Sequence, residues 1–183
     1  MLKERTDINR LKSALLYIID KLGGEADFLS IFKILYAAEK EHLSKYGRTI
    51  TKDTYIAMRY GPVPSFAYDC FKEVREYKLP SEINKPIFQS IDIHNEFIVK
   101  KKEHPDFQFL SKTDIECLDQ SIEENRDKTF GQKSDESHDL AWEQAQQDNT
   151  MDILKIAEAG GADEEMLKFI QENLEAQNIS YVG

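Results

Sequence analysis

The sequence predicts a mainly α-helical domain of the α+β class, compact and with one small β-hairpin. Apolar residues recur at helical spacing along most of the 183 residues, the period changes to two in one stretch near the middle, and the connecting segments are short. Hydrophobic residues make up 40% of the chain, which is typical of globular proteins. No run approaches the ~20 consecutive apolar residues of a membrane span, so we expect no membrane partner.

Two helices are expected at the N-terminal end. Thr6 or Asp7 can cap the first, and Gly23-Gly24 ends it. Asp27 can cap the second, which runs to about Gly47. Because apolar residues cover nearly every side of this second helix, we expect it to be the central and most buried one.

The next segment is expected to hold two helices joined by a stiff corner at Gly61-Pro62. A short helix should run through Met58, because glycine closes a helix and proline cannot continue one. Ser65 can cap the helix that follows the corner.

A β-hairpin is expected over residues 87–99. Mostly apolar residues share one parity in this stretch, and His94-Asn95 supplies a short turn. The hairpin ends in three consecutive lysines, Lys100-Lys101-Lys102.

Helices also account for the residues after the hairpin. Ser111 opens one, residues 127–137 form a loop or a second short helix, and a further helical stretch starts at His138. A short amphipathic piece covers residues 151–158, and Asp163 can cap a last helix.

The domain boundary is expected where the helical pattern is weakest, over residues 147–152. We therefore predict one domain over residues 1–147 and an acidic helical C-terminal extension over residues 148–183.

The net charge of −10 is unevenly distributed. Residues 1–105 hold 18 Lys and Arg against 15 Asp and Glu, whereas residues 106–183 hold 6 against 19. Because phosphate repels acidic side chains, this pattern argues against a protein that binds nucleic acid over its whole surface. The acidic third is either a solvated face or a surface that meets a basic partner.

No sequence motif indicates catalysis, a metal site or a cofactor. The four histidines form no HExxH pair, no cysteine lies at zinc spacing, and phosphate-binding glycine loops are absent; the histidines are His42, His94, His104 and His138. Cys70 and Cys117 fall on apolar helix faces and are expected to be reduced core thiols of a cytoplasmic protein. The N-terminal residues lack the apolar block of a signal peptide. We expect no enzyme, although a site built on His138 and nearby carboxylates stays an alternative.

Two aromatic side chains stand out from those that core packing explains. Tyr60 and Trp142 each lie at an expected helix edge beside charged residues, Tyr60 beside Arg59 and Trp142 beside His138-Asp139. An amphipathic aromatic beside arginine is typical of a protein-binding hot spot. The expected protein-binding contacts are Arg59, Tyr60, Val63, His138 and Trp142.

A DNA-binding regulator of winged-helix type is the main alternative. Three helices followed by a hairpin is the winged-helix order, and the hairpin ends in lysines. The helix that starts at Ser65 offers Lys72 and Arg75 to DNA, but acidic residues offset them, which makes this helix a poor reader of the major groove.

Three segments form an ordered set along the chain. They are Ile34–Lys40 (ILYAAEK), Ile50–Pro64 with its Tyr-Gly-Pro-Val ending, and Ser137–Trp142 (SHDLAW). In order and spacing they resemble the Panacea domain of SocA-like antitoxins, a family that includes phage-associated proteins, over about residues 8–145. Ala37 and Glu39 depart from the aromatic residue and aspartate that are commoner in the family.

The resemblance implies an α-rich Panacea domain that serves as the antitoxin of a toxin–antitoxin system. Such an antitoxin neutralises a cognate toxin, usually encoded by an adjacent gene, by direct protein–protein binding. The resemblance implies neither catalysis nor a cofactor. The toxins of the family are varied, so the target of the toxin does not follow from it. Binding of operator DNA and formation of a homodimer stay open.

Overall fold

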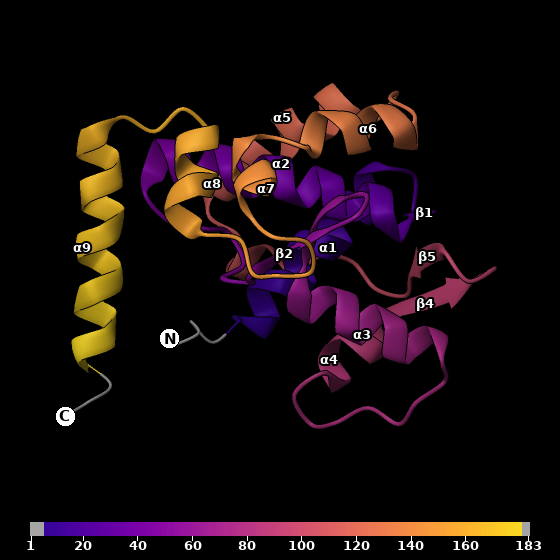
Figure 1. Cartoon of the computed structure of the whole chain (residues 1–183). Helices are drawn as coiled ribbons and strands as arrows, with labels where there is room; N and C mark the ends of the chain where they lie inside the picture. The colour runs from indigo at the N-terminus through magenta and orange to yellow at the C-terminus, as the bar shows by residue number, and fades with distance from the viewer. Residues whose placement is uncertain (1–5, 181–183) are drawn as a thin grey trace.

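The computed structural model describes residues 6–180, with side chains described as far as residue 177. Within these residues the chain forms nine α-helices, one 3-10 turn and five short strands (Figure 1). The helices are α1 (Ile8–Lys21), α2 (Phe28–Tyr46), α3 (Ser65–Arg75), α4 (Lys85–Ser90), α5 (Lys112–Asn125), α6 (Phe130–Ser137), α7 (Leu140–Gln144), α8 (Ile153–Ala159) and α9 (Glu164–Ser180). The strands are β1 (Glu25–Asp27), β2 (Tyr55–Met58), β3 (Gly61–Pro64), β4 (Ile91–His94) and β5 (Ile98–Lys101). The mainly α-helical prediction is confirmed. No helix within residues 6–180 is long and apolar enough to cross a membrane.

Helix α2 is the centre of the fold, as its apolar residues predict. It packs against α1, α5, α6 and α8 and against strand β3. Side chains on all of its sides are buried, including Phe32, Ile34, Leu35 and Tyr36. Burial on every side is what a helix without a polar face requires.

The predicted helix caps of the N-terminal part are confirmed. The Asp7 carboxylate accepts a hydrogen bond from the Arg10 amide at 3.2 Å and starts α1. The Asp27 carboxylate accepts from the Ser30 amide at 2.8 Å and starts α2, which ends at Gly47 in the left-handed region. These caps satisfy amides that have no partner inside the helix.

The predicted hairpin near residue 90 forms, but it is shorter than expected. Strands β4 and β5 pair from Ile91 onward, and β1 adds to β5 to complete a three-stranded antiparallel sheet in the order β1-β5-β4. The expectation that Ile87 and Gln89 lie in a strand is wrong, because both belong to α4. Pro86 lies in the first turn of α4, where its missing amide costs no hydrogen bond.

The expected short helix through Met58 is wrong, and so is the prediction of a single hairpin. Residues 55–58 form strand β2, which turns at Arg59-Tyr60 and pairs antiparallel with β3. Proline restricts the residue before it to extended backbone, so Pro64 holds Val63 in the strand, and neither Pro62 nor Pro64 can continue a helix. The apparent corner between two helices is therefore the turn of a second hairpin.

Helix α3 begins at Ser65, but its amides are not capped by the Ser65 hydroxyl. The carboxylate of Asp53 accepts from the amides of Phe66 and Ala67, both at 3.0 Å. The start of α3 was predicted correctly and its cap was not, because the capping side chain lies twelve residues upstream, before the β2–β3 hairpin.

The structure decides between the loop and the short helix that were both possible for residues 127–137. Residues 130–137 are helical (α6), with Thr129 and Gln132 forming a capping box. The next helix, α7, starts at Leu140 and is capped by Asp139, so His138 ends α6 and does not begin a helix.

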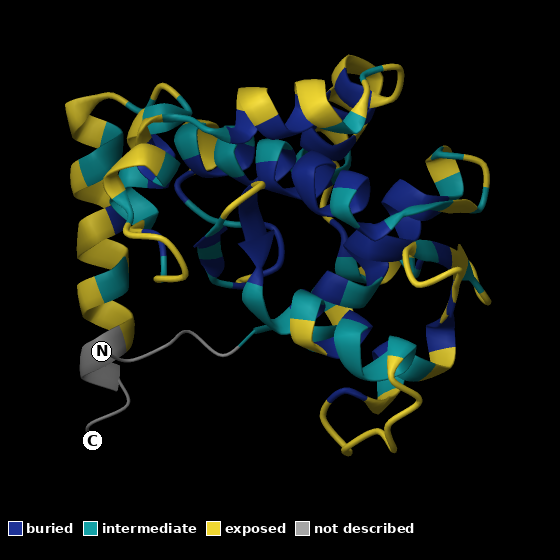
Figure 2. Ribbon diagram, turned by 45° about the vertical axis from the view of Figure 1, so that its right-hand side comes forward, coloured by how far each residue is buried: buried dark blue, intermediate teal, exposed yellow. Residues whose placement is uncertain are grey.

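The C-terminal segment packs on the domain through a second hydrophobic cluster. Met151, Ile156 and Ile170 are buried there against α2 and β2 residues that include Tyr36 and Tyr55. Backbone hydrogen bonds join β2 to the segment, with the Met151 amide donating to the Tyr55 carbonyl at 2.8 Å. The Asp163 cap of α9 is confirmed, and α9 lies at the edge of the molecule with most of its surface exposed (Figure 2). The boundary after residue 147 stays a prediction.

Candidate protein-binding site

The three motif segments of the sequence meet at one place in the fold. The first lies on α2, the second forms the β2–β3 hairpin, and the third links α6 to α7. Helix α2 packs against both β3 and α6, and α6 also contacts β3. Segments that lie up to about a hundred residues apart in the sequence therefore form one structural unit.

Asp139 joins the first motif segment to the third. Its carboxylate accepts from the Tyr36 hydroxyl at 2.9 Å and from the Lys40 ammonium at 2.8 Å. It also accepts from the Trp142 amide at 3.2 Å and thereby caps α7. Burial, followed by the negative charge of Asp139, raises the pKa of Tyr36, so the phenol remains a hydrogen-bond donor at neutral pH.

The β2–β3 turn is held by donors from three different helices. The Trp142 indole Nε1 donates to the Met58 carbonyl at 2.9 Å, and the Ser134 hydroxyl donates to the Tyr60 carbonyl at 3.0 Å. The Lys33 ammonium donates to the Pro62 carbonyl at 2.7 Å. Alternate carbonyl oxygens along the turn are thus fixed from α7, α6 and α2.

Gly61 allows the hairpin to approach α2 and α6 closely. Its φ is +98°, and a Cβ atom added there would lie 2.2 Å from the Ser137 hydroxyl oxygen and 3.0 Å from the Lys33 Nζ. A side chain at this position would therefore strain the backbone and displace two neighbouring groups at once.

The tip of the hairpin points to solvent. Arg59 and Tyr60 are exposed, and 53% of the Tyr60 surface is accessible. The Arg59 guanidinium lies 5.3 Å from the centroid of the Tyr60 ring, and the ring of Phe130 meets Tyr60 edge-on at 6.0 Å. A cation and an aromatic ring held at an exposed turn are typical anchors of protein–protein contacts.

Trp142, which binds the Met58 carbonyl of the hairpin, forms a stack with His138. Their ring centroids are 3.8 Å apart with planes at 18°, and both residues are half-buried. Among residues 6–177, the buried Nε2 atom of His138 has no hydrogen-bond partner, and no carboxylate lies at ion-pair distance from its ring.

The structure brings four of the five predicted contact residues together around the hairpin. Arg59 and Tyr60 form its exposed tip, Trp142 on α7 binds the Met58 carbonyl, and His138, which follows α6, stacks on Trp142. Val63 differs, because only 3% of its surface is accessible and its side chain packs in the main core. That any of the five contacts a partner stays a prediction.

Sequence reasoning missed two residues that organise the site, Lys33 and Ser134, and it named Asp139 only as a neighbour of Trp142 in the third motif segment. Lys33 carried a signal, since a single lysine between Phe32 and Ile34 on a helix that is apolar all round must be buried and needs a partner. Nothing in the sequence around Ser134 indicated its role, because that role depends on the Tyr60 carbonyl, 74 residues away in the chain.

The prediction of buried, reduced thiols is confirmed for both cysteines. Cys70 and Cys117 are free and buried, and burial raises the pKa of Cys70 to about 12 and that of Cys117 to about 11. Among the described residues, no group of three His, Cys, Asp or Glu side chains is arranged to hold a metal ion.

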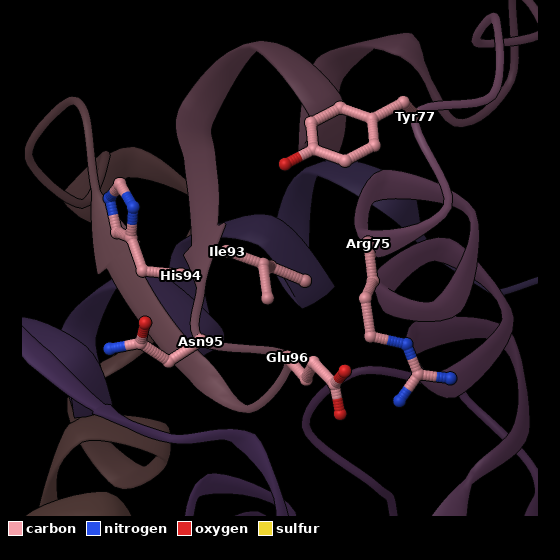
Figure 3. Close-up of a pocket in the computed structure, with 6 residues that line it drawn as sticks. All are labelled: Arg75, Tyr77, Ile93, His94, Asn95 and Glu96. Carbon is pink, nitrogen blue, oxygen red and sulfur yellow. The ribbon is translucent and has the colours of Figure 1, made fainter.

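A separate hollow of about 620 Å³ lies away from the motif segments (Figure 3). Arg75 and Tyr77, at the end of α3, face His94, Asn95 and Glu96 at the tip of the β4–β5 hairpin across it. None of the residues predicted to bind a partner lines this hollow, so the candidate site is the β2–β3 hairpin and its supports.

In a comparison with protein families, residues 31–143 match the model described as Antitoxin SocA-like, Panacea domain. This range begins in α2 and ends in α7, so it contains all three motif segments and every contact that joins them. Neither curated proteins nor solved structures gave a match to this chain.

Proposed function

Because the chain belongs to the family of SocA-like antitoxins with a Panacea domain, we propose that it neutralises a cognate toxin by binding it directly. The observation that carries this proposal is the family match across the three segments that meet at the β2–β3 hairpin. The toxin is expected to be encoded by an adjacent gene. The protein acts without catalysis or a cofactor and works in the cytoplasm.

The geometry of the hairpin supports a role in binding. Its tip exposes Arg59 and Tyr60, while its carbonyl oxygens are fixed by Lys33, Ser134 and Trp142. A surface that is already ordered loses little conformational entropy when a partner binds, so more of the contact energy contributes to affinity. Tyrosine and arginine are also the residue types that most often dominate such interfaces.

Co-expression with the product of the adjacent gene tests the proposal. The wild-type protein should bind that product and relieve the growth arrest it causes. Tyr60→Ala should weaken binding by about 30-fold, as expected for a hot-spot residue. Tyr77→Ala is the matched control, because Tyr77 is 91% exposed and lies at the separate hollow.

Two results would contradict the proposal. If the wild-type protein neither bound the neighbouring gene product nor relieved any growth arrest, the antitoxin function would be wrong. If Tyr60→Ala and Tyr77→Ala bound equally well, the hairpin tip would not be the contact.

A DNA-binding regulator of winged-helix type is the second candidate. Helices α1, α2 and α3 precede the β4–β5 hairpin, and the sheet order β1-β5-β4 favours this fold, although strands β2 and β3 are inserted before α3 and helix α4 is inserted after it. Helix α3, which would have to read the DNA, carries Lys72 and Arg75 but also Asp69 and Glu73, so it has no net positive charge for phosphate. A gel shift with the promoter of its own gene at two salt concentrations tests this candidate. Loss of the shifted band at the higher salt would support DNA binding, and no shift at either salt would exclude it.

A further inference from the structure

A cavity of about 260 Å³ is lined in part by the first and third motif segments, and four lysines lie in its walls. Lys33 and Lys40 come from α2, Lys133 comes from α6, and Lys128 precedes α6. The end of α8 at Gly160 closes one side. This volume lies just below the ~300–1,000 Å³ of pockets for drug-sized ligands, so it suits a small molecule.

Two of these lysines are buried without an opposing charge. Lys33 is 3% exposed and Lys133 is 7% exposed. The Lys33 Nζ donates to the Pro62 carbonyl and the Lys133 Nζ donates to the Lys128 carbonyl. A carbonyl oxygen satisfies one of the three donors of an ammonium group and none of its net charge.

The acidic residues around the cavity already have partners. Glu136 pairs with Lys128, and Asp139 pairs with Lys40. Glu41 pairs with Lys45, which lies outside the cavity, and Glu124 accepts from the Gln120 amide.

No carboxylate among residues 6–177 lies at ion-pair distance from Lys33 or Lys133. Asp27 and Asp127 attract the Lys133 charge only from farther away. Burial lowers the pKa of Lys33 to about 7 and also lowers the pKa of Lys133. Two buried lysine side chains that line one cavity thus have no carboxylate of the described residues at ion-pair distance to stabilise their charged forms.

We propose that this cavity binds a small phosphorylated molecule, with a dianionic phosphate group between Lys33 and Lys133. A phosphate dianion supplies the two negative charges that two lysines require, whereas a carboxylate supplies one. Lysine is a common point-charge ligand of phosphate.

Binding should change the protonation of Lys33. Near pH 8, a lysine with a pKa of about 7 is mostly neutral. A phosphate dianion beside it favours the charged form and raises that pKa, so the protein takes up a proton when the ligand binds. The other titratable groups that line the cavity are Tyr36, Lys40, Glu41, Glu124, Lys128, Lys133 and Glu136. The carboxylates are already ion-paired or hydrogen-bonded.

This site is independent of the proposed function, although it lies next to it. Lys33 lines the cavity, and its ammonium group also holds the Pro62 carbonyl of the β2–β3 hairpin. The phosphate site can be tested on the protein alone, so its failure would leave toxin binding untouched.

Isothermal titration calorimetry with inorganic phosphate near pH 8 tests the proposal. Titrations in two buffers of different ionisation enthalpy should reveal proton uptake by the wild-type protein. Lys33→Met and Lys133→Met should each weaken phosphate binding by about tenfold or more, and Lys33→Met should abolish the proton uptake. Lys112→Met is the matched control, since the Lys112 side chain is 90% exposed on α5, and it should bind phosphate as the wild type does.

Titrations with two other ligands identify the class of ligand, and a separate measurement checks that each variant is folded. Glycerol 3-phosphate shows whether a phosphate ester enters as well as the free ion, and acetate serves as the carboxylate probe. Thermal unfolding of each variant establishes that it is folded. Absence of phosphate binding by the wild type, equal binding by all variants, or acetate binding as tight as phosphate binding would each overturn the proposal.

Discussion

Substitution of Gly61 by alanine should cost far more stability than its position next to the exposed tip of the hairpin suggests. The φ of +98° is unfavourable for any residue with a Cβ, at about 1 kcal/mol. The new Cβ would also displace the Ser137 hydroxyl and the Lys33 ammonium from their bonds to the Ser134 and Pro62 carbonyls. Each lost bond costs about 1 kcal/mol, so the free energy of unfolding should fall by about 3 kcal/mol.

Two further variants separate the backbone cost from the steric cost. Gly23 has a φ of +99° with nothing within 4 Å of an added Cβ, so Gly23→Ala should cost only about 1 kcal/mol. Adding Ser137→Ala to Gly61→Ala removes the closest clashing atom, and the double variant should recover about 1 kcal/mol of the loss.

Urea unfolding followed by tryptophan fluorescence suits this comparison, because Trp142 is the one tryptophan of the chain and contacts the hairpin. If Gly61→Ala cost no more than Gly23→Ala, the close approach of the hairpin to α2 and α6 would be wrong. A double variant as unstable as Gly61→Ala alone would show that Ser137 is not the obstacle.

Three other predictions concern the same region. Asp139→Asn should lower the free energy of unfolding by about 1–2 kcal/mol, because the amide cannot match the charged bonds to Tyr36 and Lys40; Asp163→Asn, at the cap of α9, is the control in urea unfolding. The pKa of Lys33 is about 7 in the folded protein and 10.5 in the unfolded chain, so the unfolded state binds more protons between these values and stability should rise with pH. Urea unfolding near pH 9 should therefore give about 2 kcal/mol more stability than near pH 7, and Lys33→Met should abolish this gain. Ile156→Ala should cost about 2–4 kcal/mol in thermal or urea unfolding if the C-terminal segment is integral to the fold, whereas Ile83→Ala, at a residue that is 54% exposed, should be nearly neutral.

Elements whose signals are local could be read from the sequence. The caps at Asp7, Asp27 and Asp163 each bind an amide three residues downstream, and the stop at Gly47 depends on one backbone conformation. The burial of α2 followed from its composition alone. Such features need no knowledge of which distant segments lie nearby.

The β2–β3 hairpin could not be predicted in this way, because most of its stabilisation is non-local. Its strand β2 is only four residues long, too short for a period of two to stand out from a turn of helix. The hairpin is held by Lys33, which precedes it in the sequence by more than twenty residues, and by Ser134 and Trp142, which follow it by about seventy or more. A signal was present in Gly61–Pro64, where two prolines in alternate positions favour extended backbone over a helix.

The mistaken start of the β4–β5 hairpin has a similar cause. Ile87 shares parity with Ile91 and Ile93, and a buried residue in a short helix can carry the same pattern as one in a strand. Pro86 was the deciding signal, since proline is favoured in the first turn of a helix and rare inside a strand.

The contacts of the motif segments divide this site into two parts. We call Tyr36, Lys40, Gly61, Ser137 and Asp139 the platform, and Arg59 and Tyr60 the tip. Tyr36 and Lys40 bind Asp139, and Gly61 fits against Ser137, so the residues that give the chain its family resemblance mainly bind one another. Arg59 and Tyr60 contribute no side-chain hydrogen bond to this platform among the described residues and face solvent. Because platform residues cannot be changed without loss of stability, whereas tip residues can, we expect the choice of partner to depend on the tip. Exchange of Arg59 and Tyr60 for other residues should therefore alter which toxin is bound while leaving the unfolding free energy within about 0.5 kcal/mol of the wild type.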